Sequence, residues 1–327
     1  MKPIFLAAGP AFKTGGYQAA NIFETKDLYA IMAHVVGITP AKTNATLGVM
    51  TDIFADPTTV GPQSTTTTKS TTKTSSKPTT WPNQPNEGLN QKLLVVSFDG
   101  FRDMYLEKTF LPTFNSFEQQ GVISHHIQSI FPSHTYPNHW AIVTGMYAES
   151  HGIVGNKFYD PNMNKNFSFG STDTEFWDQA DPIWVTAKKQ GKKTAVAFWP
   201  GMEVDFHGYK PDFSYPRYDG SVSFEDRIDQ MIKWLRDDDA DLGLLYFNEP
   251  DHTGHNSGPD SKPVLEKLEK MDWYFSYLLQ QLETNGMGLD QVNVVICADH
   301  GMVNVTERPY IGDYTDMNNI EMVTTLI

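Results

Sequence analysis

Carboxylates and imidazoles stand directly after three apolar runs of this 327-residue chain. Asp99, the segment 249–255 (EPDHTGH) and the pair Asp299 and His300 each follow such a run. Side chains of this kind, crowded at one edge, would repel one another unless cations neutralised them. Mixed Asp and His ligands suit Zn²⁺ in particular. Each Asp taken alone also fits a cap of the next helix or turn. The recurrence of acids after three apolar runs, however, favours a metal site.

The segment 131–139 (FPSHTYPNH) adds a hydroxyl group to these candidate ligands. Pro137 is typical of the first turn of a helix, and this places Thr135 at the N-terminus of a helix that continues through 140–143. Free backbone N–H groups at such an end favour an alkoxide and an incoming phosphate. The plain alternative is that Thr135 only caps the helix.

The elements that must position these residues alternate between strand and helix. Four apolar runs have the length of buried strands: 93–98, 195–199, 242–247 and 292–298. Helices are expected over 111–120, from Ser223 onward and over 262–283, and the first eight residues are expected to form a strand followed by a turn. This alternation predicts an α/β fold with a mostly parallel central sheet and helices on both faces. In such folds, functional residues gather beyond the carboxyl ends of the strands.

Composition excludes several classes of protein. Lys and Arg total 25 against 39 Asp and Glu, a net charge of −14, and a protein that binds the nucleic-acid backbone needs a basic face instead. Cys297 is the single cysteine, so neither an intrachain disulfide nor a cysteine-based zinc site can form. No apolar run approaches the roughly 20 residues that span a bilayer.

A segment rich in Thr, Ser and Pro divides the chain at 57–86. It has no Asp or Glu and too little apolar surface to offset its ordering entropy, so we expect a disordered linker. Composition fits a mucin-like stalk and a plain flexible linker equally well. Three Asn-x-Ser/Thr sequons, at Asn44, Asn166 and Asn304, favour a glycoprotein of the extracellular space or cell surface.

Five segments after the linker resemble the ectonucleotide pyrophosphatase/phosphodiesterase family of the alkaline phosphatase superfamily, in order and spacing. They are 97–101 (SFDGF), 131–139, 145–156 (GMYAESHGIVGN), 249–255 and 299–302 (DHGM). The resemblance covers residues 90 to 327. It implies an alkaline-phosphatase-like fold and zinc-dependent hydrolysis of phosphodiester or pyrophosphate bonds in a nucleotide or similar small molecule.

The resemblance also implies roles for individual residues. One zinc ion would be held by Asp99, Thr135, Asp299 and His300. A second would be held by Asp251, His255 and one further histidine. Thr135 would be the nucleophile, and water held on the second zinc ion would open the phospho-threonine intermediate. Two divalent cations side by side lower the pKa of a hydroxyl and neutralise phosphate, as this chemistry requires.

Substrate contacts follow from the same likeness. Asn156 would steady a non-bridging phosphate oxygen. Aromatic residues stand where family members that cleave nucleotides clamp the base, at Tyr136, Trp199 and Tyr218, and Phe169 is expected to add an apolar wall. Stacking of a base on an aromatic ring is worth roughly 1–3 kcal/mol. Each aromatic residue alone fits core packing equally well. Thr174 stands where some members carry a basic residue that helps to bind nucleotides.

The chain departs from the family at both ends. None of its ten histidines lies beyond His300, so the second zinc site has only Asp251 and His255, fewer than the three protein ligands usual for catalytic zinc. Residues 1–56 resemble the closing strand, helix and tail of the same catalytic domain. We therefore expect the tail of one domain at 1–56, the linker, and at 87–327 the front of a second domain that is incomplete at its C-terminal end. We hypothesise that residues 1–54 dock into the vacant place of this second domain, as in a circular permutant.

Three functions remain in competition at this point. Zinc-dependent hydrolysis of nucleotide phosphodiesters or pyrophosphates leads, with weak or absent turnover expected for this chain. A choline-lipid phosphodiesterase is the second hypothesis within the same chemistry. A catalytically inert binding module is the third, because the second zinc site lacks a ligand.

Overall fold

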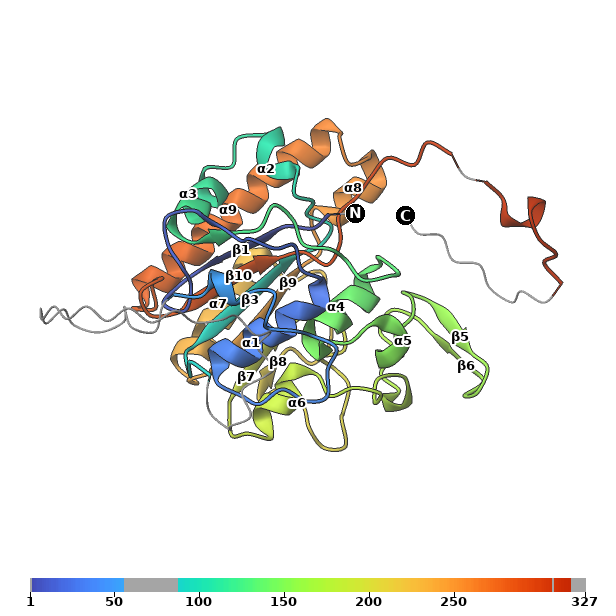
Figure 1. Ribbon diagram of the computed structural model, residues 1–327, viewed down its shortest axis with the longest axis horizontal. Coiled ribbons are helices and arrows are strands. Elements are labelled where there is room, and N and C mark those ends of the chain that lie inside the picture. The colour runs from blue at the N-terminus through green and yellow to red at the C-terminus, as the bar shows by residue number, and fades with distance from the viewer. Residues whose placement is uncertain (1, 56–87, 308, 319–327) are drawn as a thin grey trace, which may run out of the picture.

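The computed structural model describes residues 2–55, 88–307 and 309–318, so the expected linker at 57–86 lies outside the described residues. A central sheet of eight strands, in the order β2-β4-β1-β10-β3-β9-β7-β8, runs through the molecule (Figure 1). These strands are β1 Phe5–Ala8, β2 Tyr17–Gln18, β3 Leu93–Phe98, β4 Val122–Ile123, β7 Thr194–Ala197, β8 Phe213–Ser214, β9 Leu242–Phe247 and β10 Asn293–Cys297. A small hairpin of β5 Phe158–Asp160 and β6 Lys165–Phe167 lies apart from it.

Five neighbouring strands of the central sheet are parallel, which confirms the expected sheet type. Strand β3 lies between β10 and β9, and all six of its residues are buried. Apolar runs of this kind are typical of strands covered by helices on both faces. Because β3, β9 and β10 are parallel and in register, their carboxyl ends meet at one edge of the sheet.

Helices cover both faces of this sheet (Figure 1). The helices are α1 Leu28–Val36, α2 Tyr105–Lys108, α3 Pro112–Gln120, α4 Thr135–Thr144, α5 Ala148–His151, α6 Ile183–Lys188, α7 Phe224–Arg236, α8 Asp251–Ser257 and α9 Lys262–Thr284. Buried residues of α1, α4 and α6 share one hydrophobic core, and those of α3, α7 and α9 share a second core on the opposite face. The sheet is therefore the middle of three layers. The described residues also form short 3-10 helices, η1 Thr25–Asp27, η2 Thr51–Ile53, η3 Thr174–Phe176 and η4 Ile311–Asp313.

Local sequence explains where the functional helices begin. Helix α4 starts at Thr135 with Pro137 in its first turn, as expected, and ends at Gly145, whose φ of 68° suits glycine. Helix α7 is capped by Ser223, whose hydroxyl accepts a hydrogen bond from the backbone N–H of Asp226. The long helix expected at 262–283 is α9, which starts one residue after Ser261.

Residues from both sides of the gap at 56–87 build the same sheet. Strand β1 pairs antiparallel with β10 on one side and with β4 on the other, and the residues of α1 lie in one of the two cores. His34 contacts residues on both sides of segment 56–87. Its ring lies 4.7 Å from that of Phe54, and its backbone carbonyl accepts a hydrogen bond from the Leu89 N–H. Within the described residues, no helix is both long and apolar enough to cross a membrane.

Candidate active site

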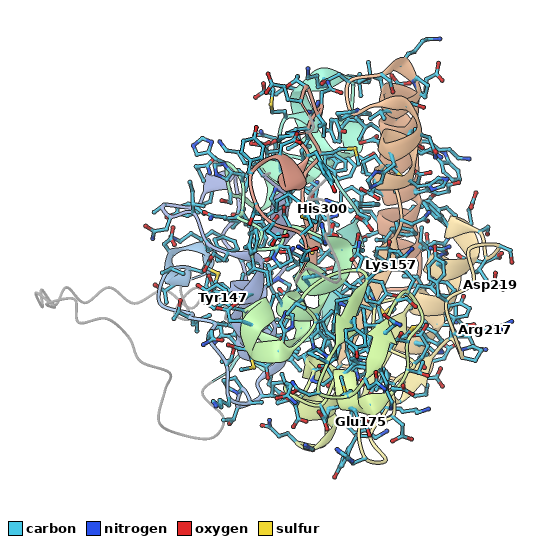
Figure 2. All side chains as sticks on the ribbon, turned by 90° about the vertical axis from the view of Figure 1, so that its right-hand side faces the viewer. Tyr147, Lys157, Glu175, Arg217, Asp219 and His300 are labelled. Atoms are coloured by element: carbon cyan, nitrogen blue, oxygen red, sulfur yellow. The ribbon has the colours of Figure 1, made fainter. Side chains whose placement is uncertain are left out.

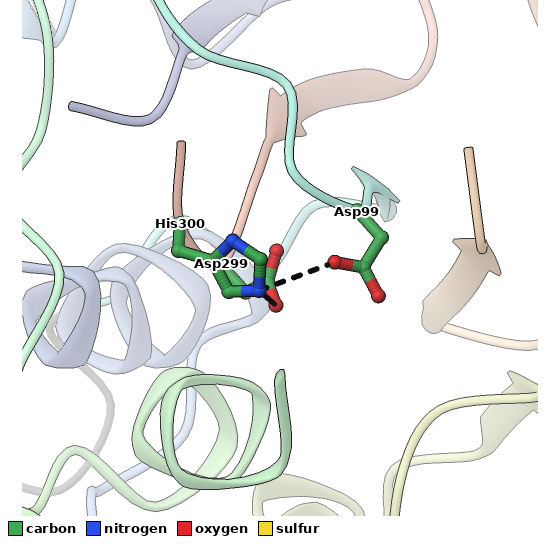
Figure 3. A group of neighbouring side chains, drawn as sticks. All are labelled: Asp99, Asp299 and His300. Carbon is green, nitrogen blue, oxygen red and sulfur yellow. Dashed lines mark ion pairs between the residues drawn. The ribbon is translucent and has the colours of Figure 1, made fainter. Parts of the chain in front are cut away.

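The ends of β3 and β10 bring Asp99, Asp299 and His300 together, and we call these three residues the buried triad (Figure 3). One ligand atom from each lies within 4.8 Å of the other two. His300 Nε2 lies 3.2 Å from Asp299 Oδ2 and 3.5 Å from Asp99 Oδ1. All three side chains are almost fully buried. The triad is therefore a compact set of candidate metal ligands that water barely reaches.

The hydrogen-bond pattern of the triad fits a cation. Asp99 Oδ1, Asp299 Oδ2 and the nearby Asp251 Oδ1 are buried carboxylate oxygens that make no hydrogen bond. His300 Nδ1 lies 3.0 Å from the Gly301 carbonyl, which only accepts, so Nδ1 carries a proton and Nε2 is the ring nitrogen that faces the carboxylates. Three carboxylates crowded in a buried site with so few hydrogen bonds are costly, and a divalent metal ion would neutralise them.

Tyr246 and Gly100 position the three acids of the site. The hydroxyl of Tyr246, on β9, donates to Asp99 Oδ2 at 2.6 Å. Gly100, with φ of 70°, packs so closely on Asp251 that a Cβ atom would come within 2.9 Å of the Asp251 Cβ. The Gly100 N–H also donates to Asp299 Oδ1 at 3.2 Å. A side chain at position 100 would therefore push Asp251, at the start of α8, away from the end of β3.

The pKa values of the two acidic triad residues move in opposite directions. Burial, and then the charges of Asp299 and Asp251, raise the pKa of Asp99 well above its usual range. Burial alone would raise the pKa of Asp299, but His300, His139 and the Gly100 N–H hold it below its usual range. Opposite shifts of the two pKa values are expected for two carboxylates that share one small buried space.

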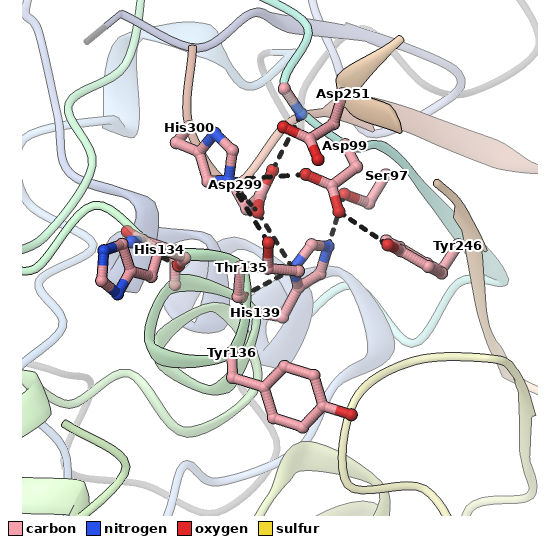
Figure 4. A network of polar contacts seen from close by, with 12 residues as sticks. Ser97, Asp99, His134, Thr135, Tyr136, His139, Tyr246, Asp251, Asp299 and His300 are labelled. Carbon is pink, nitrogen blue, oxygen red and sulfur yellow. Dashed lines mark hydrogen bonds and ion pairs between the residues drawn. The ribbon is translucent and has the colours of Figure 1, made fainter. Parts of the chain in front are cut away.

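Thr135 lies where the expected helix N-terminus meets the triad (Figure 4). Its Oγ1 is 3.4 Å from His300 Nε2. Asn156 also lies at this helix end, where its Oδ1 accepts from the backbone N–H of Tyr136 at 2.8 Å. That oxygen therefore bonds to the helix end, and Asn156 is not among the residues that line the neighbouring cleft.

His139, one turn further along α4, connects Thr135 to the triad. Its Nδ1 lies 2.9 Å from the Thr135 carbonyl and 3.3 Å from Asp299 Oδ2, while its Nε2 lies 2.8 Å from Ser97 Oγ. The ring is fully buried. A histidine in a helix gives no signal of its own in the sequence, and this contact depends on how α4 crosses the sheet.

The expected second group of ligands lies on helix α8. Asp251 is its first residue and His255 lies one turn later, with Nε2 3.3 Å from Asp251 Oδ2. The hydrogen bond that the His255 ring donates to Asp251 is the main cause that raises the pKa of His255. We call these two residues the helix pair. Within the described part of the chain, neither residue of the helix pair belongs to a group of three or more metal-ligand atoms close enough to hold one ion.

A cleft of about 520 Å³ opens beside Thr135 and both groups of ligands, a size usual for small-molecule sites. All four aromatic residues expected to contact substrate line it, namely Tyr136, Phe169, Trp199 and Tyr218. Phe169 and Tyr218 are partly exposed, whereas Trp199 is buried and donates from Nε1 to the His139 carbonyl at 3.1 Å. Trp199 is therefore a fixed part of the wall.

Further cleft residues escaped the sequence analysis. Tyr246, Asn248, His252 and Glu203 all line the cleft. Glu203 Oε1 accepts from the Tyr218 N–H at 2.9 Å, which ties two parts of the wall together. Asn248 and Glu203 follow the ends of β9 and β7, so their position after a strand was the available signal. Thr174 instead donates to the Asp205 carbonyl at 2.9 Å and does not line the cleft.

Comparison with known proteins shows which family the chain belongs to. The family model described as type I phosphodiesterase / nucleotide pyrophosphatase matches residues 93–326. The chain belongs to this family. Its match includes every residue of the triad, the helix pair and α4, and the proteins that it resembles are named as nucleotide pyrophosphatases and phosphodiesterases.

Individual relatives match the chain at about 40% identity. Human ectonucleotide pyrophosphatase/phosphodiesterase family member 5 is 39% identical over 251 residues, which cover 75% of this chain and 52% of the relative. A Xenopus laevis bis(5'-adenosyl)-triphosphatase is 39% identical over 222 residues, 67% of this chain and 48% of the relative. The chain thus spans about half the length of these curated relatives.

Solved structures agree on the fold. An inactive variant of murine family member 5, solved in complex with AMP, superposes with a TM-score of 0.66 at 40% identity, covering 69% of this chain and 62% of the murine chain. The unmodified murine protein gives a TM-score of 0.65 at 41% identity, with the same coverage. These matches confirm the alkaline-phosphatase-like α/β fold of a mostly parallel sheet between helices.

Proposed function

We propose that this chain hydrolyses phosphodiester or pyrophosphate bonds of nucleotides, with Thr135 as the nucleophile. The observation that carries the proposal is the position of Thr135 Oγ1, which lies 3.4 Å from His300 Nε2 at the N-terminus of α4 and lines the cleft. Buried carboxylate oxygens without hydrogen bonds lie on Asp99 and Asp299, beside His300, and on Asp251. A capping role alone would leave these oxygens unexplained.

Zinc is the metal that these donors fit best, since carboxylate and imidazole ligands together suit it. The buried triad and Thr135 would hold one ion, and the helix pair, Asp251 and His255, would take part in holding the second. Two bound zinc ions would supply charge neutralisation at the phosphate and would lower the pKa of the threonine hydroxyl.

The protein's own groups account for the rest of the reaction. Thr135 Oγ1 forms a bond to phosphorus while the bond from phosphorus to the leaving oxygen breaks, and the hydroxyl proton passes to water. Water then cleaves the phospho-threonine and restores the hydroxyl, releasing a monoester. The positive end of the α4 dipole favours the charge that develops on the phosphate. Asn156, bonded to that helix end, remains our candidate for steadying a phosphate oxygen.

The aromatic wall supports a nucleotide as the substrate. Tyr136, Phe169 and Tyr218 line the cleft and offer ring surface to a base. Burial raises the pKa of Tyr136 to about 12, so its hydroxyl stays neutral at physiological pH. Among the relatives, one is named a bis(5'-adenosyl)-triphosphatase, and an inactive threonine-to-alanine variant of murine family member 5 was solved with AMP. Both names favour a nucleotide over a choline lipid.

The three sequons support an extracellular or cell-surface glycoprotein. Asn44, Asn166 and Asn304 are all exposed in the described residues, as a glycan requires. Several relatives are named ectonucleotide pyrophosphatases. Expression in a secretory host, followed by endoglycosidase treatment, should give a mass decrease that Asn→Gln variants of the sequons lack.

Thr135→Ala, compared with Thr135→Ser, tests the proposal. The p-nitrophenyl ester of thymidine monophosphate is the nucleotide probe, and p-nitrophenyl phosphocholine is the choline probe. We expect the Ala variant to lose roughly 10³-fold or more in turnover while the Ser variant retains measurable activity. Activity surviving Thr135→Ala would overturn the nucleophile assignment. Faster cleavage of the phosphocholine ester would favour the lipid hydrolase, and about one zinc per chain without turnover would favour the inert module.

A further inference from the structure

The side chain of Asn138 organises the loop that leads into Thr135. Its Oδ1 accepts from the Ile130 N–H at 2.8 Å, and its Nδ2 lies 3.0 Å from the Pro132 carbonyl and 3.1 Å from the His134 carbonyl. The side chain is fully buried. One amide group thus determines the path of residues 130–134, immediately before the proposed nucleophile.

A hydroxyl from the other end of the chain orients this amide. Thr25, in η1, donates from Oγ1 to Asn138 Oδ1 at 3.0 Å and accepts from the Ile130 N–H at 3.4 Å. Thr25 is also fully buried. Because Thr25 and Ile130 both donate toward Oδ1, the Nδ2 end of the amide must face the loop carbonyls. With the hydroxyl removed, that orientation would depend on a single donor.

The segment around Thr25 is itself anchored on both sides of α4. The Thr25 N–H donates to the Gln128 carbonyl, and the Gln128 N–H donates to the Phe23 carbonyl, each at 2.8 Å. The hydroxyl of Tyr147, beyond the far end of α4, donates to Glu24 at 2.6 Å. Figure 2 shows Tyr147 beside the N-terminal segment, away from His300. Thr25 therefore lies in a segment that hydrogen bonds on both sides hold in place.

We propose that Thr25 is a positioning residue for Thr135, so that residues before the linker take part in the reaction. This inference rests on the proposed function, since it takes Thr135 as the nucleophile. Thr25 touches neither substrate nor the buried triad and acts through Asn138. A displacement of about 1 Å at a reacting group can lower a rate roughly 10²-fold, so a small rearrangement of the loop is enough to matter.

Thr25→Val tests this role because it keeps the branched shape and removes the hydroxyl. We expect kcat to fall roughly 10-fold to 100-fold with KM and zinc content unchanged. Thr43→Val is the matched control, since Thr43 lies in the same N-terminal segment and donates to the Gly145 carbonyl at the opposite end of α4. The control should lose stability without a change in kcat.

Hydrogen exchange measured by mass spectrometry adds a readout that does not need turnover. Peptides covering 130–138 should exchange faster in Thr25→Val and not in Thr43→Val. If Thr25→Val does not fold, Thr25→Ser and Thr25→Ala differ only by the hydroxyl, and the Ser variant should restore both kcat and protection.

The outcomes separate this inference from the proposed function. Wild-type kcat and wild-type exchange in Thr25→Val, together with an inactive Thr135→Ala, would overturn the role of Thr25 and leave the nucleophile in place. Activity in Thr135→Ala would overturn the proposed function whatever Thr25 does. If the chain has no turnover, unchanged exchange over 130–138 in Thr25→Val would by itself refute the positioning role.

Discussion

Asp99 of the buried triad and both residues of the helix pair line one cleft, but the two groups are built in different ways. Asp99 and Asp299 leave two adjacent strands whose residues pair in register from Asn293 with Leu93 onward. Asp251 and His255 lie one turn apart on a seven-residue helix. The triad side chains are at most 5% exposed, whereas the side chain of His255 is 46% exposed. The triad belongs to the core of the fold, whereas the helix pair joins a largely buried acid, Asp251, to an exposed histidine, His255.

Support from neighbouring residues differs in the same way. Tyr246 holds Asp99, while the Gly100 N–H and His139 hold Asp299. The helix pair has mainly its own internal ion pair. Groups that supporting contacts already hold in place lose less entropy when they bind an ion. We therefore expect the triad to bind zinc more tightly than the helix pair does.

Asp299→Asn is the change with the largest expected effect on this comparison. It removes a charged oxygen from the triad, and we expect turnover to fall roughly 10³-fold, because several kcal/mol of charge stabilisation depend on that metal site. Zinc content, measured by atomic absorption after dialysis, should fall by about one ion per chain.

His255→Ala is the counterpart on the helix pair. Because that site is weaker from the start, the variant should lose about 10-fold in turnover and should keep the tightly bound zinc of the triad. Equal losses of turnover and of tightly bound zinc in both variants would contradict a difference between the two groups.

His139→Phe sharpens the comparison by changing the support of the triad instead of a ligand. The substitution keeps a planar ring but removes the nitrogen that faces Asp299. We expect zinc affinity at the triad to fall about 10-fold to 100-fold, as measured by competition with a chelator of known affinity.

Two observations control for a general loss of structure in His139→Phe. Zinc bound by the helix pair should keep its affinity, because His139 does not contact it. Ser97→Ala, which removes only the partner of His139 Nε2, should give a smaller loss at the triad. An equal loss of zinc affinity at both sites would show that His139 supports the fold as a whole.

Much of the fold was predictable from the sequence because its signals are local. The apolar runs of β3, β9 and β10 have strand length, and Pro137 together with Gly145 delimits α4. The order of the strands beside β1 was not predictable in this way. Strand β1 lies between β4 and β10 because of pairing with residues more than 100 positions away, and no local pattern determines such a partner.

The candidate site shows the same difference between residues with a local sequence signal and residues placed by long-range contacts. Acids directly after strands predicted the triad, since parallel strands bring their carboxyl ends together. Tyr246 and His139 could not be found, because a tyrosine within a strand and a histidine within a helix are typical of core packing. Thr25 was equally hidden, since its partner Asn138 lies 113 positions away. The phosphate contact of Asn156 stays a prediction.

His151 gives the smallest expected effect on activity, because it lies outside both groups of ligands. Its ring is fully buried at the end of α5, where Nδ1 accepts from the Ile153 N–H and Nε2 donates to the Pro137 carbonyl. Burial lowers the pKa of His151 to about 4. The residue is therefore neutral in the folded protein at a pH where the unfolded chain binds a proton.

Acidification should destabilise the wild-type chain through His151, and His151→Gln should remove that part of the loss. Between the unfolded pKa near 6.5 and the folded value of about 4, the unfolded state binds one more proton, so stability falls as the pH falls. The free energy of unfolding should decrease from pH 7 to pH 4.5 by about 2 kcal/mol more in the wild type than in the variant. Urea titrations of both proteins with a chelator present measure this difference and keep metal loss out of it. An identical pH dependence in the two proteins would show that His151 titrates normally, and its burial between α4 and α5 would then carry no energetic consequence at acidic pH.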